Sequence, residues 1–309
     1  MRQAISPEQR LLVTLRFLAT GESYHSMQHQ FRIGKSTLCK IIPHTCAVIW
    51  AALQPRCMPF PTTNYFQAIS KGFEEKTDFP NCLGAIDGKH IRVIQPPHSG
   101  TLFFNYKKYF SIVLLAIADS DSNFIAIETG SYGSTNDSRI LETSAMARQL
   151  LQKHINIPPA KALTGSSTIL PHVFVADEAF GLRTHLLRPY CKRGLTNMKR
   201  IYNARLSRAR KTVECAFGIL SGQWRLLKAA ICLSVENVDT VVKACCVLHN
   251  FSRIGMSPHA LLDVGNDVNL ANTIDQCNCR ALSGWRTRDE FLKYFNSEHG
   301  AVAWQYDAI

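Results

Sequence analysis

The chain has 309 residues, a net charge of +12 and 46% apolar residues. This length is enough for one large domain with a small appendage, and the apolar content excludes general disorder. The clean apolar runs, such as residues 112–118, are too short to cross a bilayer, so we expect no membrane partner. Residues 1–10 are polar and lack the apolar region of a secretory signal.

Nearly all of the excess positive charge lies in one stretch of the chain. Between Arg183 and Lys228 there are twelve Lys and Arg residues and one acid, Glu214. Such a concentration of charge favours a polyanionic partner, and nucleic acid is the commonest one. The alternative is an ordinary basic surface that contacts only water.

The cysteines predict free thiols rather than a metal site or disulfides. There are 11 cysteines and no CxxC pair; Cys277 and Cys279 form CxC, and Cys245 and Cys246 are adjacent in an apolar stretch. Structural zinc sites need paired thiolates, so we expect a reducing compartment, cytosol or nucleus. Cys246 and His249 have the spacing of a zinc pair on a helix, but core packing is the preferred interpretation.

Residues 1–53 predict a small helical segment. Ser6 with Pro7 after it starts a helix, and Gly21 ends it. The predicted buried face of this helix consists of Leu11, Leu12, Leu15 and Leu18. Because the chain begins almost directly at this segment, an upstream part of the protein can be missing from the sequence.

A tight turn at residues 32–34 connects a second short helix to a third, residues 35–42, and this pair is similar to a helix-turn-helix. Lys35, Ser36 and Thr37 would then begin the recognition helix and contact DNA. An ordinary helical hairpin is the alternative.

The rest of the chain predicts an α/β domain with a mixed sheet. A linker with a leading helix covers residues 54–78, the main domain covers 79–253, and the C-terminal tail, 254–309, contains a short helix at 288–295. Apolar runs and turn residues predict strands at 83–86, 90–94, 111–118, 124–129 and 173–176, and helices at 138–153, 203–220 and 235–251. Asp87 and Gly88 form a hairpin signal between the first two strands.

Four acids are placed where they could build a metal site. Asp87 and Asp177 follow apolar strands, Glu214 lies in the basic helix, and Asp137 opens a helix. Carboxylates hold Mg²⁺ or Mn²⁺, and two such ions can cleave a phosphodiester. Simpler roles remain open: a turn residue for Asp87, a helix cap for Asp137, a surface acid for Asp177, and an ion pair with Arg210 or Lys211 for Glu214.

The chain also resembles the Harbinger-type transposases and their domesticated relatives, a DDE superfamily. The matching segments cover nearly the whole chain, in the family's order: residues 5–24 and 31–42, FPNCLGAIDGKHI at 79–91, GSTNDSRIL at 133–141, VADEAFGL at 175–182, YNARLSRARKTVECAFGIL at 202–220 and ACCVLHNF at 244–251. Ser221 and Gln223 replace basic residues that the family commonly has, and residues 157–171 are a predicted insertion.

The resemblance implies an RNase H-like fold and a nuclease centre. Asp87, Asp177 and Glu214 match the catalytic acids, and Asp137 matches a further metal-binding acid. We therefore expect a divalent-metal endonuclease acting on DNA in the nucleus, in which Arg205, Arg208, Arg210 and Lys211 bind the DNA backbone. A separate helper protein could supply DNA recognition, and the oligomeric state stays open. The alternative is a domesticated, catalytically silent DNA-binding or adaptor protein; a protein-binding basic helix without metal is a third reading.

Overall fold

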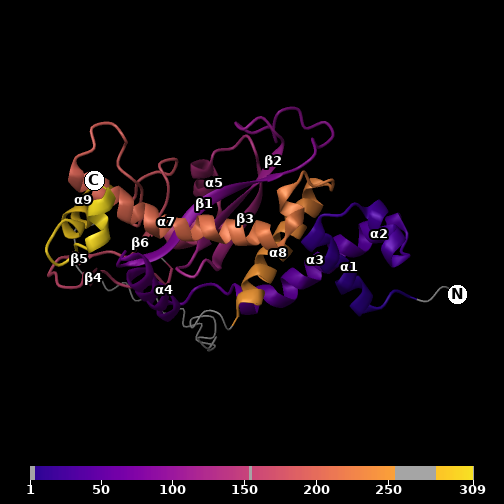
Figure 1. Ribbon diagram of the computed structural model, residues 1–309, viewed down its shortest axis with the longest axis horizontal. Coiled ribbons are helices and arrows are strands. Elements are labelled where there is room, and N and C mark those ends of the chain that lie inside the picture. The colour runs from indigo at the N-terminus through magenta and orange to yellow at the C-terminus, as the bar shows by residue number, and fades with distance from the viewer. Residues whose placement is uncertain (1–3, 153–154, 255–282, 309) are drawn as a thin grey trace.

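The computed structural model describes residues 4–152, 155–254 and 283–308. Its first helices are α1 (Pro7–Thr20), α2 (Tyr24–Phe31) and α3 (Lys35–Cys57). The Ser6 hydroxyl accepts a hydrogen bond from the Gln9 backbone N–H, and Gly21 ends α1 with φ of 70°. The predicted start and end of the first helix are confirmed. Figure 1 shows these three helices at one end of the molecule.

The buried face of α1 agrees with the predicted one at Leu18, which is buried, and at Leu15, which packs against the core, but differs at the other two positions. Val13, Phe17 and Leu18 are in the core, where α1 packs against α3 and the 3-10 turn η2 (Arg225–Lys228). Leu11 and Leu12 are exposed. The apolar residues of α1 are spaced three and four apart on two neighbouring faces of the helix, so the sequence is compatible with the burial of either face. The positions of α3 and η2 determine which face is buried.

The third helix is longer than predicted because it continues through Pro43. Its apolar positions Cys46 and Ile49 extend the buried face that packs on α8 (Val235–Arg253), and this packing compensates for the backbone hydrogen bond that proline removes. By length and composition alone, α3 could cross a membrane. Core helices of soluble proteins can have this length and composition; five α3 side chains are buried within the fold, and most of the helix is not.

A five-stranded mixed sheet forms the centre of the main domain. Its order is β3-β2-β1-β6-β7, with antiparallel pairing among β1, β2 and β3 and parallel pairing of β6 with β1 and β7. The bounds are β1 (Cys82–Arg92), β2 (Ser111–Ala118), β3 (Phe124–Tyr132), β6 (Val173–Val175) and β7 (Leu186–Leu187). The predicted insertion contains a separate two-stranded ribbon, β4 (Lys161–Ala162) with β5 (Ile169–Leu170).

The predicted hairpin at Asp87–Gly88 is wrong, because β1 runs straight through both residues. Asp87 pairs with Ala116 and Gly88 with Leu115 on β2. A Cβ atom on Gly88 would lie 2.5 Å from the carboxylate of Asp137. The glycine therefore makes room for a close side chain within a strand and does not serve a turn.

Helices cover the sheet and extend past it. Their bounds are α4 (Thr63–Thr77), α5 (Asp137–Thr143), α6 (Ala145–Ala147), a π-helical turn (Arg148–Gln152), α7 (Asn197–Gln223) and α8. Helices α4 and α7 pack on β1, and α8 packs on β3. The predicted helix at 138–153 is broken at Ser144, which caps α6. Helix α7 starts earlier than predicted, because Thr196 caps it.

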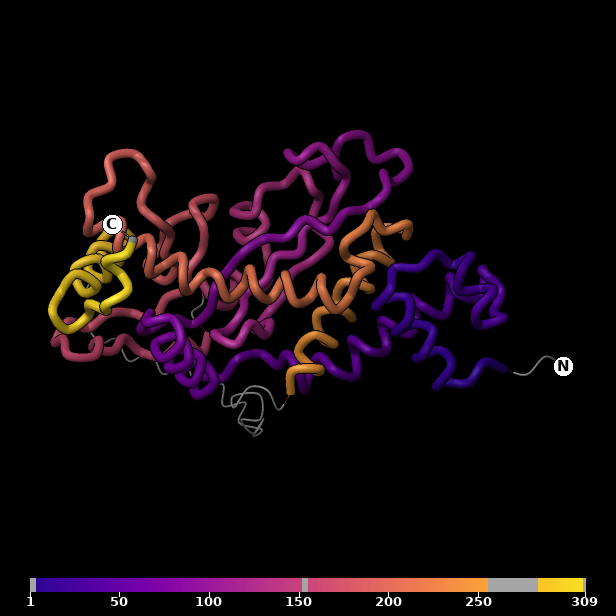
Figure 2. The backbone as a smooth tube through the Cα atoms, in the orientation of Figure 1, coloured from indigo at the N-terminus to yellow at the C-terminus, as the bar shows by residue number. Residues whose placement is uncertain are grey.

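The C-terminal tail contains α9 (Gly284–Phe295) and a 3-10 turn, η3 (Ala303–Ala308), and both pack against α7. Figures 1 and 2 show this part at the opposite end of the molecule from α1–α3. The mixed sheet with its flanking helices is consistent with the RNase H-like fold that the resemblance implied.

The cysteines that the structure describes are all free thiols, as predicted. Cys277 and Cys279 lie outside the described residues. Cys246 and His249 are buried in the core, where His249 Nε2 lies 2.8 Å from the backbone oxygen of Ser122. Burial lowers the pKa of His249 to about 4. Packing, rather than zinc binding, therefore explains this pair.

Candidate active site

Strand register places Asp87 and Asp177 side by side. Ala85 of β1 pairs in parallel with Val175 of β6, and each acid follows its member of this pair by two residues. Asp177 lies two residues beyond the end of β6, and its negative charge contributes to the raised pKa of Asp87, so the two carboxylates are near each other. Asp87 Oδ1 accepts a hydrogen bond from the Gly88 N–H at 2.8 Å, and Asp177 Oδ1 accepts one from the Ala179 N–H at 2.9 Å.

Helix α5 adds Asp137 to these two acids. Asn136 is the helix cap, since its side chain accepts a hydrogen bond from the Arg139 N–H, and Asp137 is the first helical residue. The Asp137 carboxylate lies over Gly88, directly beside Asp87. Capping therefore does not explain Asp137, whose side chain instead faces the other acids.

The charges of these three acids interact. The pKa of Asp87 is raised to about 6, chiefly by burial, with a smaller contribution from the negative charges of Asp177 and Asp137, while the Gly88 N–H and Arg210 oppose the shift. Burial also raises the pKa of Asp137, with a further contribution from Asp177. Perturbed carboxyls that face one another mark a candidate functional site.

Glu214 joins the cluster through an arginine. It lies on α7, where Arg210 Nη2 is 2.5 Å from Glu214 Oε1, and Arg210 Nη1 is 3.4 Å from Asp87 Oδ2. The guanidinium is therefore located between the two carboxylates and neutralises part of their charge. The ion pair of Glu214 with Arg210 that the sequence left open is therefore present, and Arg210 is the link between Glu214 and Asp87.

The donor set fits a hard divalent cation, since Asp87, Asp137, Asp177 and Glu214 offer only oxygen ligands. Within the described residues, however, no group of three or more His, Cys, Asp or Glu side chains is arranged to hold a metal ion. Arg210 supplies positive charge between Asp87 and Glu214. The metal-binding role of the four acids accordingly stays a prediction.

Asp87→Asn is expected to stabilise the metal-free protein at neutral pH. With its pKa raised to about 6, Asp87 lowers the free energy of unfolding as pH rises from about 4 to about 6. Above that range the native state carries a cost of about 1–3 kcal/mol, which the amide avoids. Melting curves should therefore show a higher Tm for the variant near pH 7.5 and no advantage near pH 4.

Millimolar Mn²⁺ should raise the Tm of the wild type and have a smaller effect on Asp87→Asn, because the variant lacks one proposed ligand. Asp307→Asn, which changes an exposed acid near the C-terminus, is the matched control and should behave like the wild type. A lower Tm of Asp87→Asn at neutral pH would mean that the Arg210 ion pair outweighs the cost of burial.

Three of the predicted DNA-binding residues of α7, Arg205, Arg208 and Lys211, recur at three-residue spacing, and this basic stripe is divided among different partners. Arg205 is 2% exposed, and its guanidinium donates to Gly300 O at 3.0 Å, Gln305 Oε1 at 2.9 Å and Asp78 O. It also lies 4.4 Å from the ring centroid of Phe295. Arg205 fastens the C-terminal tail to α7 and is not placed to contact a phosphate, which corrects its predicted DNA-binding role.

The other basic residues of α7 stay closer to the surface. Arg208 is half-exposed, 3.7 Å from the Asp78 carboxylate and 4.5 Å from the ring centroid of Trp304. Lys211 is exposed, while Arg210 is held in the acid cluster. Arg208 and Lys211 are therefore the α7 cations of the predicted stripe that face solvent.

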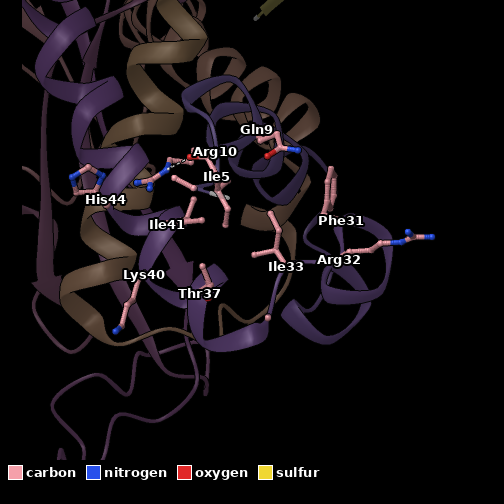
Figure 3. A pocket seen from close by; sticks show the side chains of 12 residues that line it. Ile5, Gln9, Arg10, Phe31, Arg32, Ile33, Thr37, Lys40, Ile41 and His44 are labelled. Atoms are coloured by element: carbon pink, nitrogen blue, oxygen red, sulfur yellow. Dashed lines mark hydrogen bonds between the residues drawn. The ribbon is translucent and has the colours of Figure 1, made fainter. Parts of the chain in front are cut away.

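The predicted contact residues of the helical segment are accessible. Lys35, Ser36 and Thr37 are exposed at the start of α3. Thr37 also lines a cavity of about 760 Å³ together with Lys40 and His44 (Figure 3). A DNA-contacting role for these residues stays a prediction.

Two lysines near the acids were not singled out from the sequence. Lys107, in the loop before β2, lowers the pKa of Asp137 by its positive charge. Burial and Lys107 lower the pKa of Lys89, which follows Gly88 on β1. Lys89 could have been identified from the sequence, because it lies two residues after Asp87 in the same strand. Lys107 could not, because it lies in a loop whose position the sequence does not predict.

Comparison with known proteins supports the family that the site suggests. Residues 86–250 match the model of the DDE superfamily endonuclease family. Among curated relatives, an ALP1-like protein of Arabidopsis thaliana is 28% identical over 80% of this chain and 60% of its own length. The Arabidopsis protein named antagonist of like heterochromatin protein 1 is 27% identical over 80% of this chain and 62% of its own length.

HARBI1 of Homo sapiens, named as a candidate nuclease, is 26% identical over 81% of this chain and 68% of its own length. The chain thus spans about three fifths of the plant relatives. No solved structure gives a significant match. The family match covers more than half of the chain and includes the four acids. The chain therefore belongs to the DDE superfamily endonucleases, in the Harbinger-derived family of transposases and their relatives.

Proposed function

We propose that this protein is a divalent-metal-dependent endonuclease that cleaves DNA phosphodiesters. The observation that carries the proposal is the convergence of acids from separate elements: Asp87 and Asp177 by strand register, Asp137 over Gly88, and Glu214 joined to Asp87 by Arg210. Such a concentration of negative charge costs stability, so a fold that retains it needs a functional reason.

Mg²⁺ or Mn²⁺ bound by these acids would supply an activated water and stabilise the leaving 3′ oxygen. The residues of the chain would prepare the site for that chemistry. Asp87 and Asp177 are fixed by backbone N–H donors, and strands rather than loops carry or precede them. Arg210 neutralises Asp87 and Glu214 and is close enough to the acids to pair with a bound phosphate.

DNA would contact the exposed cations of the molecule. Arg208 and Lys211 on α7 would bind the backbone, and Lys35, Ser36 and Thr37 would contact it through the helical segment. The protein would act in the nucleus, without a membrane partner, and a separate helper protein would supply target recognition. The oligomeric state is left open.

A plasmid-nicking assay tests the proposal. The wild-type chain should convert supercoiled DNA to the nicked form with Mn²⁺ or Mg²⁺ and should stop when a chelator is added. Asp177→Asn, purified in the same way, controls for contaminating nucleases and should be inactive. If the wild type binds DNA but does not nick it with either metal, the cleavage proposal fails.

The second candidate function is that of a silent DNA-binding or adaptor protein. It is favoured by one relative that is named as an antagonist of a heterochromatin protein rather than as a nuclease. Arg210 also forms ion pairs with two of the four acids, so these carboxylates already have a positively charged partner. Binding without nicking in the same assay would support this alternative.

A further inference from the structure

A basic and aromatic pocket begins one residue after Asp177. Its volume is about 430 Å³, and Glu178 lies on its wall. We call it the Trp285 pocket; its other main lining residues are Arg188, Tyr190, Arg193, Lys199, Trp285 and Arg288. These come from three places in the chain, namely the segment after β7, the first turn of α7, and α9. The function proposed above does not use this pocket.

The charge of the Trp285 pocket favours an anionic ligand. Four cationic side chains line it against one carboxylate, that of Glu178. Arg193 is exposed and Lys199 is half-exposed. Within the part of the chain that the structure describes, neither Arg193 nor Lys199 forms an ion pair with a carboxylate. Lys199 Nζ lies 5.2 Å from the ring centroid of Tyr190, a contact that brings no opposite charge, so both cations are available to a phosphate.

Two aromatic rings of the pocket flank one buried arginine. The Arg288 guanidinium lies 3.8 Å from the ring centroid of Tyr190 and 5.2 Å from that of Trp285. Arg288 is 5% exposed, and its Nε is buried without a hydrogen-bond partner among the described residues. Tyr190 is fixed by a hydrogen bond from its hydroxyl to Asp289 Oδ1 at 2.5 Å.

Trp285 is 65% exposed, although it belongs to this fixed stack. A buried arginine thus supports a large ring whose surface remains open to solvent. A planar group can stack on such a ring without rearranging the pocket. A nucleobase provides this planar group, and its phosphates would meet Arg193 and Lys199. An acidic peptide would pair with Arg193 and Lys199 but would leave the Trp285 ring without a stacking partner.

Backbone contacts connect the pocket to the acid cluster. Arg188 Nη1 donates to Glu178 O at 3.2 Å and to Phe180 O at 3.1 Å, which fixes the segment that follows Asp177. A strand held at the acids would therefore continue over Glu178 toward Trp285. The Glu178 carboxylate repels phosphate at this side, so the phosphate belongs at the other side, near Arg193 and Lys199.

We propose that the Trp285 pocket binds one unstacked nucleotide of the DNA strand next to the cleaved phosphodiester, with its base on Trp285 and its phosphate between Arg193 and Lys199. The place of the nucleotide next to a cleaved phosphodiester rests on the proposed function, whereas nucleotide binding by the pocket does not. The pocket would position an unpaired or locally melted strand, so single-stranded DNA is its substrate class.

Binding of short labelled oligothymidylates to the full chain, measured by fluorescence anisotropy with a chelator present, tests the pocket without cleavage. The wild type should bind the normal oligonucleotide about tenfold more tightly than one of equal length and charge with abasic sites. Trp285→Ala should lose this preference, and Trp285→Phe should keep part of it. Tyr306→Ala, which removes another exposed aromatic ring, should leave the preference unchanged.

Arg193→Ala should lower the slope of log affinity against log salt by about one, equally for both oligonucleotides. Lys71→Ala removes an exposed cation on α4 and should leave the slope unchanged. Melting curves verify that each variant is folded. The proposal is overturned if folded Trp285→Ala keeps the preference for bases, or if polyglutamate competes as well as an oligonucleotide of equal charge. A base preference without nicking would retain the pocket and reject only the cleavage proposal.

Discussion

Glu214→Gln is expected to separate cleavage from DNA binding. Plasmid nicking should fall by about a hundredfold or more, because a charged group at the reacting phosphate contributes on that scale. DNA affinity without metal should hold or increase, because the substitution removes a negative charge beside the proposed phosphate path. The side chain is 46% exposed and contacts Arg210 at the surface of α7, so the fold should tolerate the change.

A helical ion pair elsewhere in the chain provides the matched control for this variant. Glu75 pairs with Lys71 on α4 at 3.7 Å and is exposed, so Glu75→Gln removes a comparable charge away from the acids. It should leave both nicking and affinity unchanged. Full nicking by Glu214→Gln would reduce Glu214 to a partner of Arg210 and would remove it from the proposed metal site.

The sequence predicted the elements of the fold better than their ends. Apolar runs gave β2 and most of β3, and the capping residue Ser6 gave the start of α1. The end of α3 was predicted at residue 42, directly before Pro43, where local preference disfavours a continuing helix. The packing of α3 on α8 outweighs that preference, and a single sequence does not report such tertiary contacts.

Asp87 was identified as a candidate site residue although its local structure was predicted wrongly. Asp-Gly signals a turn when the glycine is needed for its backbone freedom. In β1 the glycine is needed for space, since the Asp137 carboxylate occupies the place of a side chain. Only the three-dimensional approach of α5 distinguishes these two uses of glycine.

The charges on α7 show a further limit of sequence patterns. Arg205, Arg208 and Lys211 recur at three-residue spacing, and a solvent-facing stripe was the simplest interpretation. A helix has 3.6 residues per turn, so side chains three residues apart do not lie directly above one another. Each step moves the side chain around the helix, and one end of the stripe therefore faces the interior. The C-terminal tail covers that end, and no local pattern announces that α9 and η3 return to α7.

Arg205→Ala is therefore expected to damage the fold rather than DNA binding. The substitution leaves three acceptors without their donor, those of Gly300 and Gln305 in buried hydrogen bonds, and removes a cation from the face of Phe295. An acceptor left without its partner costs about 1–3 kcal/mol, so the loss of the three hydrogen bonds is expected to cost about 3–5 kcal/mol in total. For a chain of this size the Tm should fall by about 6–15 °C.

The destabilisation should be concentrated in the tail, because Arg205 connects α7 to Gly300 and Gln305. Hydrogen exchange in α9 and η3 should accelerate more than exchange in β1 or β2. Arg205→Lys keeps a charge but not the planar fork, so it should lie between the wild type and Arg205→Ala. Lys211→Ala, on the same helix and exposed, should change stability by less than about 0.5 kcal/mol.

DNA binding by Arg205→Ala discriminates between the two roles of the residue. At a temperature where the variant is folded, its salt slope should equal that of the wild type, because a buried guanidinium releases no counterion from DNA. Lys211→Ala should lower the slope by about one. If Arg205→Ala instead lowers the slope and leaves the Tm unchanged, Arg205 faces DNA in solution, and the basic stripe is restored as a phosphate-binding surface.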